Sequence, residues 1–168
     1  MVIGMLAAVD ARQGQRMQQA APPAQGPVIG LPVPPLGAGP YEFQAAEQQK
    51  IRVTVVTKGL SHPWSLVFLP DGSMLVTERP GRLRIVSRDG KLSPALAGVP
   101  KVFASGQGGL HDVIIDRGYG QNQTIYFCYA EPVGPGARTA LARARLVDPG
   151  TPRLEEVTVI FQQDGPLS

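Results

Sequence analysis

The segment from Gly106 to Asp112 reads Gly-Gln-Gly-Gly-Leu-His-Asp and gathers several chemically capable residues in a short stretch. Its glycines allow the backbone to approach a ligand or another chain segment closely, because no Cβ stands in the way. Gln107 lies between two of them and offers both an amide donor and a carbonyl acceptor. The segment therefore predicts either a ligand contact through Gln107 or a tight turn between two units of the fold, and both interpretations stay open.

Other common chemistries are excluded or weakly supported by the sequence. A dinucleotide fingerprint would need glycine where His111 stands, and no helical pattern follows. His62 could be a base or a metal ligand, but no second His, Asp or Glu lies at ligand spacing, which favours a loop histidine. No Walker motif, nucleophile elbow, serine triad or paired metal-ligand motif occurs. We therefore assign no catalytic and no metal-binding residue.

Trp64 and Cys128 are the chain's single tryptophan and single cysteine. For Trp64 we expect packing between structural units rather than stacking on a ligand. A lone cysteine permits no internal disulfide. Because Cys128 lies inside the apolar run from Ile125 to Tyr129, we expect a buried structural thiol rather than a nucleophile.

Short apolar runs separated by turn residues position these side chains. Residues 66–69, 74–76 and 82–88 are separated by Pro70-Asp71-Gly72 and Pro80-Gly81, and Asp89-Gly90 ends the third run. Proline presets φ and glycine accepts positive φ, so the pattern predicts an antiparallel meander. We expect its first strand to be buried on both faces and its third to be half exposed.

The same pattern occurs a second time, in residues 110–115, 125–129, 139–146 and 157–161. Leu66 and Leu110 start equivalent strands about 44 residues apart, which is typical of propeller blades. The fold class is therefore all-β, a β-propeller of which about two four-stranded blades are present. Propellers have roughly four to eight blades, so the chain resembles a piece of a larger ring.

The remaining segments divide the chain into three parts. Residues 1–10 are a possible signal remnant, residues 11–50 a Pro/Gln/Ala-rich linker, and residues 51–168 the partial propeller domain. Within them we expect a turn or two of helix over 41–50, a strand over 52–57 and a loop over 131–137. No stretch is long enough to span a bilayer.

The net charge of +3 is mild, although basic residues cluster in the first unit. These are Arg79, Arg82, Arg84, Arg88 and Lys91. A solvated outer strand explains the cluster better than a nucleic-acid surface, because no aromatic side chains interleave to stack bases.

An ordered series of motifs resembles one known family, the glucose/sorbosone dehydrogenases, which are soluble aldose sugar dehydrogenases that use pyrroloquinoline quinone (PQQ). The motifs are Leu60-Ser61-His62-Pro63-Trp64-Ser65, Leu69-Pro70-Asp71-Gly72, Leu75-Val76-Thr77-Glu78-Arg79, Gly98-Val99-Pro100 and Gly106-Gln107-Gly108-Gly109-Leu110. The resemblance covers about residues 51–164.

The resemblance implies a six-bladed propeller with a cofactor site at one end of its channel. It implies PQQ held with calcium, oxidation of an aldose sugar at the anomeric carbon to a lactone, and an external electron acceptor. By motif position, Gln107 with Gly106 and Gly108 would contact the cofactor. The resemblance also implies a periplasmic or secreted location.

The sequence departs from the family's pattern in places. His111 stands where the family usually has an apolar residue, and residues 116–119 replace its usual turn. The family's base histidine lies shortly after the strand that here ends at Phe161, and Ser168 precedes that place. We therefore expect an N-terminal fragment that is inactive alone. The alternatives are a non-catalytic propeller binding module and an inactive truncated product.

Overall fold

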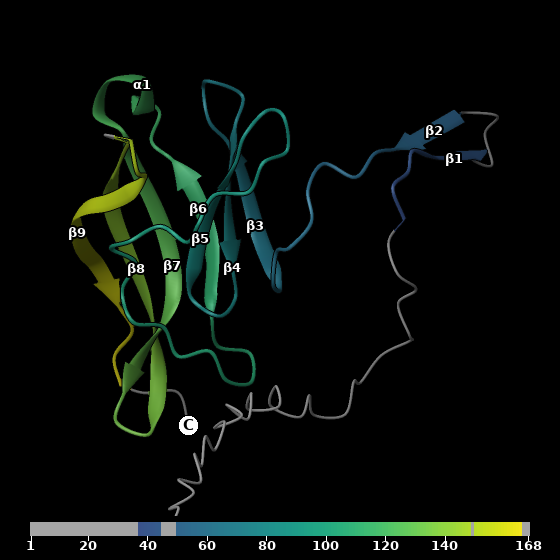
Figure 1. Cartoon of the computed structure of the whole chain (residues 1–168). Helices are drawn as coiled ribbons and strands as arrows, with labels where there is room; N and C mark the ends of the chain where they lie inside the picture. The colour runs from purple at the N-terminus through teal and green to yellow at the C-terminus, as the bar shows by residue number, and fades with distance from the viewer. Residues whose placement is uncertain (1–36, 45–49, 149, 166–168) are drawn as a thin grey trace, which may run out of the picture. The chain divides into compact units, whose positions relative to one another are not determined.

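The structure, a computed structural model, describes residues 37–44, 50–148 and 150–165. Apart from one helical turn its regular elements are antiparallel strands, as the sequence predicts (Figure 1). They form sheets of two, three and four strands. Among the described residues, no helix is long and apolar enough to cross a membrane.

The first sheet is a hairpin of β1 (Tyr41–Gln44) and β2 (Lys50–Val53). The helix expected over 41–50 is wrong for Tyr41–Gln44, because these residues form a strand that pairs with β2. An ion pair of 3.0 Å between Arg52 and Glu42 joins the two strands. The strand expected over 52–57 begins earlier and ends at Val53. Most of the predicted linker and all of residues 1–10 lie outside the described residues.

The second sheet, here called blade 1, consists of β3 (Pro63–Phe68), β4 (Met74–Glu78) and β5 (Arg82–Val86) in that order. It has three strands rather than four. The expectation that the first strand is buried on both faces is wrong, because the middle strand β4 is the most buried one. The third strand, β5, is half buried, as expected. β3 is an edge strand, and on its outer face Leu66 and Phe68 are 47% and 64% exposed.

The third sheet, here called blade 2, consists of β6 (Leu110–Ile115), β7 (Thr124–Val133), β8 (Gly136–Val147) and β9 (Arg153–Gln162), with α1 (Tyr119–Asn122) between β6 and β7. The loop expected over 131–137 is wrong, because β7 and β8 continue as a hairpin to a turn at residues 134–135. An ion pair of 2.5 Å between Arg138 and Glu131 joins its two strands.

The core lies between blades 1 and 2, which pack face to face (Figure 1). Leu75 and Leu83 of blade 1 share one buried cluster with Leu110, Phe127 and other residues of blade 2. On blade 2, large side chains of β7 lie opposite alanines of β8, as in the pairs Phe127–Ala142 and Tyr129–Ala140. Alternating large and small residues let the two blades approach closely.

The two blades repeat one another in register. β3 and β6 each contain an irregularity near their start, between Pro63 and Leu66 and between Leu110 and Val113. After it, Leu66 pairs with Val76 in blade 1, as Val113 pairs with Phe127 in blade 2. The internal repeat predicted from the sequence is therefore confirmed, but its register differs from the prediction. Leu110 is equivalent to Pro63 and Val113 to Leu66, so Leu66 and Leu110 do not occupy equivalent positions.

Candidate functional site

Three loops meet where the two blades join. They are the residues before β3, the β4–β5 turn and the turn before β6. The N–H of Arg79, which follows β4, donates to the carbonyl of His62 at 2.9 Å, and the N–H of Leu110 donates to the carbonyl of Arg79 at 3.0 Å. Arg79 therefore links both neighbouring loops through its backbone alone.

The guanidinium of Arg79 holds the turn that carries Gln107. Its Nη1 donates to the carbonyl oxygen of Gly106 at 2.7 Å and lies 3.4 Å from that of Gly108. The same turn is closed by a bond of 2.8 Å from the N–H of Gly108 to the carbonyl of Ser105. The turn of blade 2 is thus fixed from blade 1.

Two glycines of this turn are required by packing. A Cβ at Gly109 would lie 2.4 Å from Cγ and 2.8 Å from the carbonyl oxygen of Arg79. A Cβ at Gly108 would lie 2.5 Å from the carbonyl oxygen of Phe103. Gly106 differs, because it has a φ of +54° and no neighbour within 4 Å of the Cβ position. Close packing between blades thus explains part of the glycine pattern, as the turn interpretation predicts.

Gln107 lies exposed at the tip of the turn. The main-chain carbonyl oxygen of Gln107 is 3.1 Å from Nε2 of His111. The ring of His111 lies against that of Trp64, with ring centroids 4.9 Å apart and an angle of 30° between the ring planes. Trp64 thus contacts the neighbouring blade, yet it remains 51% exposed. The structure places three of the residues singled out in the sequence, Gln107, His111 and Trp64, in one group.

In the part of the chain that the structure describes, neither His62 nor Cys128 bonds to Gln107, His111 or Trp64. His62 is an exposed loop residue with a φ of 50°, and its Nδ1 lies 3.2 Å from Oγ of Ser61. Cys128 is a free, half-buried thiol on β7. Over the described ranges, no group of three or more His, Cys, Asp or Glu side chains is placed to hold a metal ion.

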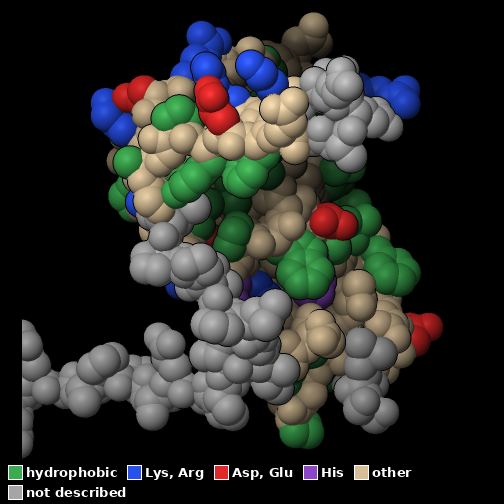
Figure 2. Space-filling model, turned by 90° about the vertical axis from the view of Figure 1, so that its right-hand side faces the viewer, with side chains coloured by type: hydrophobic (Ala, Val, Ile, Leu, Met, Phe, Trp, Pro, Cys, Tyr) green, Lys and Arg blue, Asp and Glu red, His purple; other side chains and the backbone are tan. Residues whose placement is uncertain are grey.

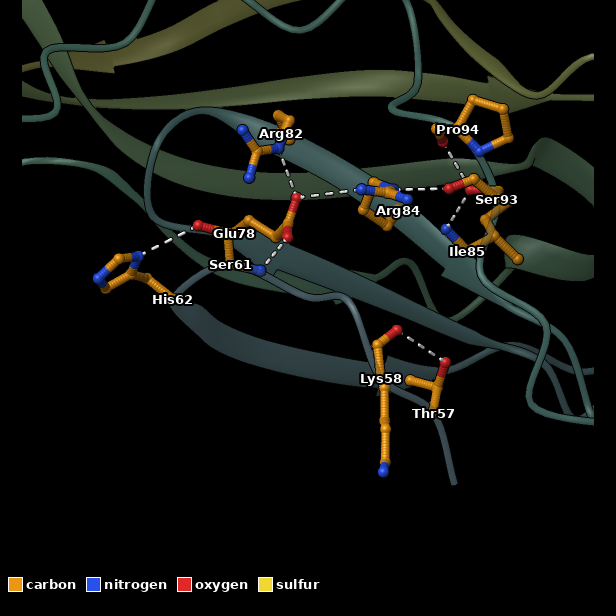
Figure 3. A network of polar contacts seen from close by, with 10 residues as sticks. All are labelled: Thr57, Lys58, Ser61, His62, Glu78, Arg82, Arg84, Ile85, Ser93 and Pro94. Carbon is orange, nitrogen blue, oxygen red and sulfur yellow. Dashed lines mark hydrogen bonds and ion pairs between the residues drawn. The ribbon is translucent and has the colours of Figure 1, made fainter. Parts of the chain in front are cut away.

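Glu78, at the end of β4, is a buried carboxylate that our reading of the sequence missed. It accepts a short hydrogen bond from the N–H of Ser61 and one of 2.6 Å from Nε of Arg82, and Nη1 of Arg84 lies 3.6 Å away (Figure 3). A signal was available, because Glu78 and Arg82 flank a tight turn and become cross-strand partners.

The surroundings of Glu78 keep it ionised. Burial by itself would raise the pKa of the carboxyl, but the hydrogen bonds from Arg82 and Ser61 and the charges of Arg82 and Arg84 outweigh it and lower the pKa. The anchored carboxylate fixes the loop before β3, which carries His62 and leads directly into Trp64 near the start of β3. It is therefore a structural support of the candidate site.

The exposed amide of Gln107 fits one contact with a quinone oxygen or another polar ligand group, since its side chain can donate and accept. Arg79 is a cation that bonds this turn, and its Nη1 is engaged by the backbone carbonyls of Gly106 and Gly108. The turn can thus supply a neutral contact, whereas an anionic ligand would need cations from elsewhere.

Comparisons with known proteins point to one family. Residues 60–167 match the family "Glucose / Sorbosone dehydrogenase". The chain is 40% identical over 120 residues to the aldose sugar dehydrogenase YliI of Escherichia coli, a match that covers 70% of this chain and 32% of that protein.

Comparison with solved structures points to the same family. A crystal structure of glucose dehydrogenase has a TM-score of 0.62 and 49% identity, over 66% of this chain and 32% of that one. The PQQ-bound aldose sugar dehydrogenase of Streptomyces coelicolor has a TM-score of 0.58 and 25% identity, over 64% and 32%. The chain thus spans about a third of the length of each of these proteins. The two blades are blades of a β-propeller.

Proposed function

Because the chain belongs to the glucose/sorbosone dehydrogenase family, we propose that it forms part of a quinoprotein that oxidises aldose sugars at the anomeric carbon to lactones. Similar proteins support this: the E. coli relative is an aldose sugar dehydrogenase, and the Streptomyces structure contains PQQ. The observation that carries the proposal is the exposed side chain of Gln107 on a turn fixed by Arg79.

In this proposal Gln107 contacts the cofactor, and the backbone of Gly106 and Gly108 lies close to it. A bound PQQ would supply the hydride acceptor for oxidation of the sugar, and an external acceptor would then take up the electrons. Arg79 and His111 orient the turn through the carbonyls of Gly106, Gly108 and Gln107. The described residues would orient the cofactor contact and supply one amide. The calcium ligands, the cations and the base would therefore be supplied by other residues.

A chimera tests this proposal. Residues 60–167 would replace the matching segment of the E. coli aldose sugar dehydrogenase, and oxidation of glucose would be measured with PQQ, calcium and a dye acceptor. We expect PQQ-dependent activity in the chimera. In the 168-residue chain we expect no oxidation above free cofactor, because a general base typically contributes about 10²–10⁴-fold and none is assigned here.

Two substitutions in the chimera test the site. Gln107→Ala should raise the PQQ concentration needed for half activity more than His111→Leu does, because Gln107 would touch the cofactor and His111 would act through the turn. An inactive but folded chimera would favour the non-catalytic binding module. Full cofactor use by the Gln107→Ala form would remove Gln107 from the site and leave the fold unaffected.

We also propose a periplasmic or secreted location, supported by the short apolar run at residues 1–9. Fractionation of cells that express the natural gene would test it. Recovery of the protein in the cytoplasmic fraction, with residues 1–9 still attached, would contradict it.

A further inference from the structure

The β7–β8 hairpin extends beyond the sheet at the same end of blade 2 as the turn that carries Gln107. Leu110, which follows this turn, pairs with Tyr129, and the ladder of β6 and β7 ends at that pair. Because the two strands are antiparallel, residues before Leu110 and residues after Tyr129 lie beyond the same edge of the sheet. Figure 1 shows the hairpin there, below the other strands of blade 2. We call residues 131–138 the edge hairpin.

Backbone hydrogen bonds hold the base of the edge hairpin against the loop that contains Gln107. The N–H of Ala130 donates to the carbonyl of Gly109 at 2.9 Å, and the carbonyl of Ala130 accepts from the N–H of Phe103 at 2.8 Å. Phe103 and Gly109 lie on either side of Gln107 in the chain. The edge hairpin therefore rises directly beside the proposed cofactor contact.

The stem of the edge hairpin is braced from two sides. Oε2 of Glu131 accepts a hydrogen bond of 2.5 Å from Nε of Arg138 and one of 2.7 Å from Nε2 of Gln162 on β9. Beyond this point Pro132 and Pro135 fix the φ angles of two further positions. Because the stem is cross-linked and the tip has few conformations to choose from, the edge hairpin is a preformed wall at this end of the blade.

The tip of the edge hairpin has no polar side chain. Residues 132–137 read Pro-Val-Gly-Pro-Gly-Ala, and the two prolines also lack an N–H. By strand alternation Val133 lies on the same face of the sheet as Tyr129, which belongs to the core between the blades. This face is turned toward blade 1, from which Arg79 holds the Gln107 turn. In Figure 2 the lower end of the described surface, where the edge hairpin lies, shows hydrophobic and uncharged side chains.

We propose that the edge hairpin sets substrate preference: it disfavours disaccharides relative to monosaccharides, because it faces a second sugar ring with a wall that offers no side-chain hydrogen bond. This inference rests on the proposed function, in which an aldose is oxidised beside Gln107. Residues 130–133 of β7 extend the wall by roughly 13 Å at about 3.3 Å per residue, which exceeds the width of one pyranose ring. A hydroxyl group of a second ring would lose water there without gaining a partner, and such a loss discriminates against the larger substrate.

The test uses the chimera with the E. coli enzyme, in which residues 132–137 are replaced by Asn-Gly. Glu131 and Arg138 are partners in the ladder, so a two-residue Asn-Gly turn can close the hairpin directly after their ion pair. The quantity measured is the ratio of kcat/KM for maltose to kcat/KM for glucose, in the parent chimera and in the shortened form. Both sugars have a free anomeric carbon, and maltose adds a second ring.

A second variant, Val133→Thr, tests the chemistry of the wall while keeping its shape, since threonine places a hydroxyl where valine has a methyl group. The matched control is Val159→Thr, at a residue of β9 that is 39% exposed and pairs with Ala142 in the middle of β8. Far-UV circular dichroism and thermal melting establish that each form is folded. The PQQ concentration needed for half activity reports whether the Gln107 turn is intact.

We expect the maltose-to-glucose ratio to rise about tenfold in the shortened form, as relief of one unpaired hydroxyl group implies. Val133→Thr should raise the ratio by a smaller factor and Val159→Thr should not change it, while the PQQ concentration for half activity stays constant throughout. An active chimera whose ratio does not respond to shortening would overturn the inference and leave the proposed function standing. If the shortened form does not fold, an unchanged ratio in Val133→Thr overturns it instead. A folded parent chimera without PQQ-dependent activity would overturn both the proposed function and this inference.

Discussion

The guanidinium of Arg79 donates a 2.7 Å hydrogen bond to the carbonyl oxygen of Gly106, across the junction between the two blades. Arg79 follows the last residue of β4, and Gly106 precedes Gln107 on the turn that leads into β6. The position of Gln107 therefore depends on blade 1 as well as on its own sheet.

Replacing Arg79 by Met should loosen the turn. The two carbonyls would lose their charged donor at a cost of about 1–2 kcal/mol, which corresponds to a five- to thirtyfold increase in local opening. Amide hydrogen exchange at residues 106–109 measures this. Arg79→Lys should recover part of the protection, whereas Arg117→Met, at an exposed residue, should leave it unchanged. Equal amide exchange at these residues in Arg79→Met and in the parent would show that Arg79 does not hold the turn.

Replacing Gly109 by Ala should destabilise the junction by about 2 kcal/mol or more, since the new methyl would overlap the backbone and side chain of Arg79. Gly106→Ala is the matched control. It meets no neighbour and costs only the strain of a positive φ, about 1–2 kcal/mol at most. Urea unfolding would rank them, and a Gly109→Ala form more stable than Gly106→Ala would refute this packing.

Replacing Glu78 by Gln should lower the free energy of unfolding by about 2–3 kcal/mol. Breaking a buried pair typically costs about 3–5 kcal/mol, but Arg82 and Arg84 keep part of their hydration, with side chains 39% and 18% exposed. Glu42→Gln, which removes the exposed pair with Arg52, should change stability by less than about 1 kcal/mol. Chemical denaturation of the two variants at pH 7 makes the comparison.

The ionisation of Glu78 should also make stability depend on pH. Its pKa is lower in the folded chain than in the unfolded one, so its contribution is complete above the unfolded pKa of about 4.3. The contribution is lost as the pH falls below that value through the folded pKa. As the pH is lowered from about 5 to about 2, where such a carboxylate titrates, the Glu78→Gln form should therefore lose stability less steeply than the parent. If the free energy of unfolding changed with pH in parallel for the two forms, Glu78 would not be preferentially ionised in the folded chain.

The strands of both blades could be predicted because Asp-Gly and Pro-Gly turns separate short apolar runs. The β7–β8 hairpin could not, because Pro132 and Pro135 normally argue against strands. Pairing with β6 ends at Tyr129. Beyond this point β7 has no ladder partner on that side, and a proline can be accommodated there.

The candidate site was predictable only in part. Gln107 was identifiable from its place among glycines, and His111 from its departure from the family's pattern. The pair of Glu78 with Arg82 could have been read from the local pattern. The bond of Glu78 to Ser61 and those of Arg79 to Gly106 and Gly108 join residues 17 to 29 positions apart, which no local pattern encodes. The burial of β3 was overestimated because an apolar run does not reveal whether a neighbouring sheet covers it.

The stacking of Trp64 on His111 gives the protein a built-in optical reporter. Trp64 is the chain's only tryptophan, so all indole emission comes from one place, next to the residue that contacts the carbonyl of Gln107. Its exposed ring lies beside the proposed cofactor contact rather than in the distant core. A change in that emission would therefore register events at the Gln107 turn without any attached dye, and unfolding of blade 2 alone would register as well.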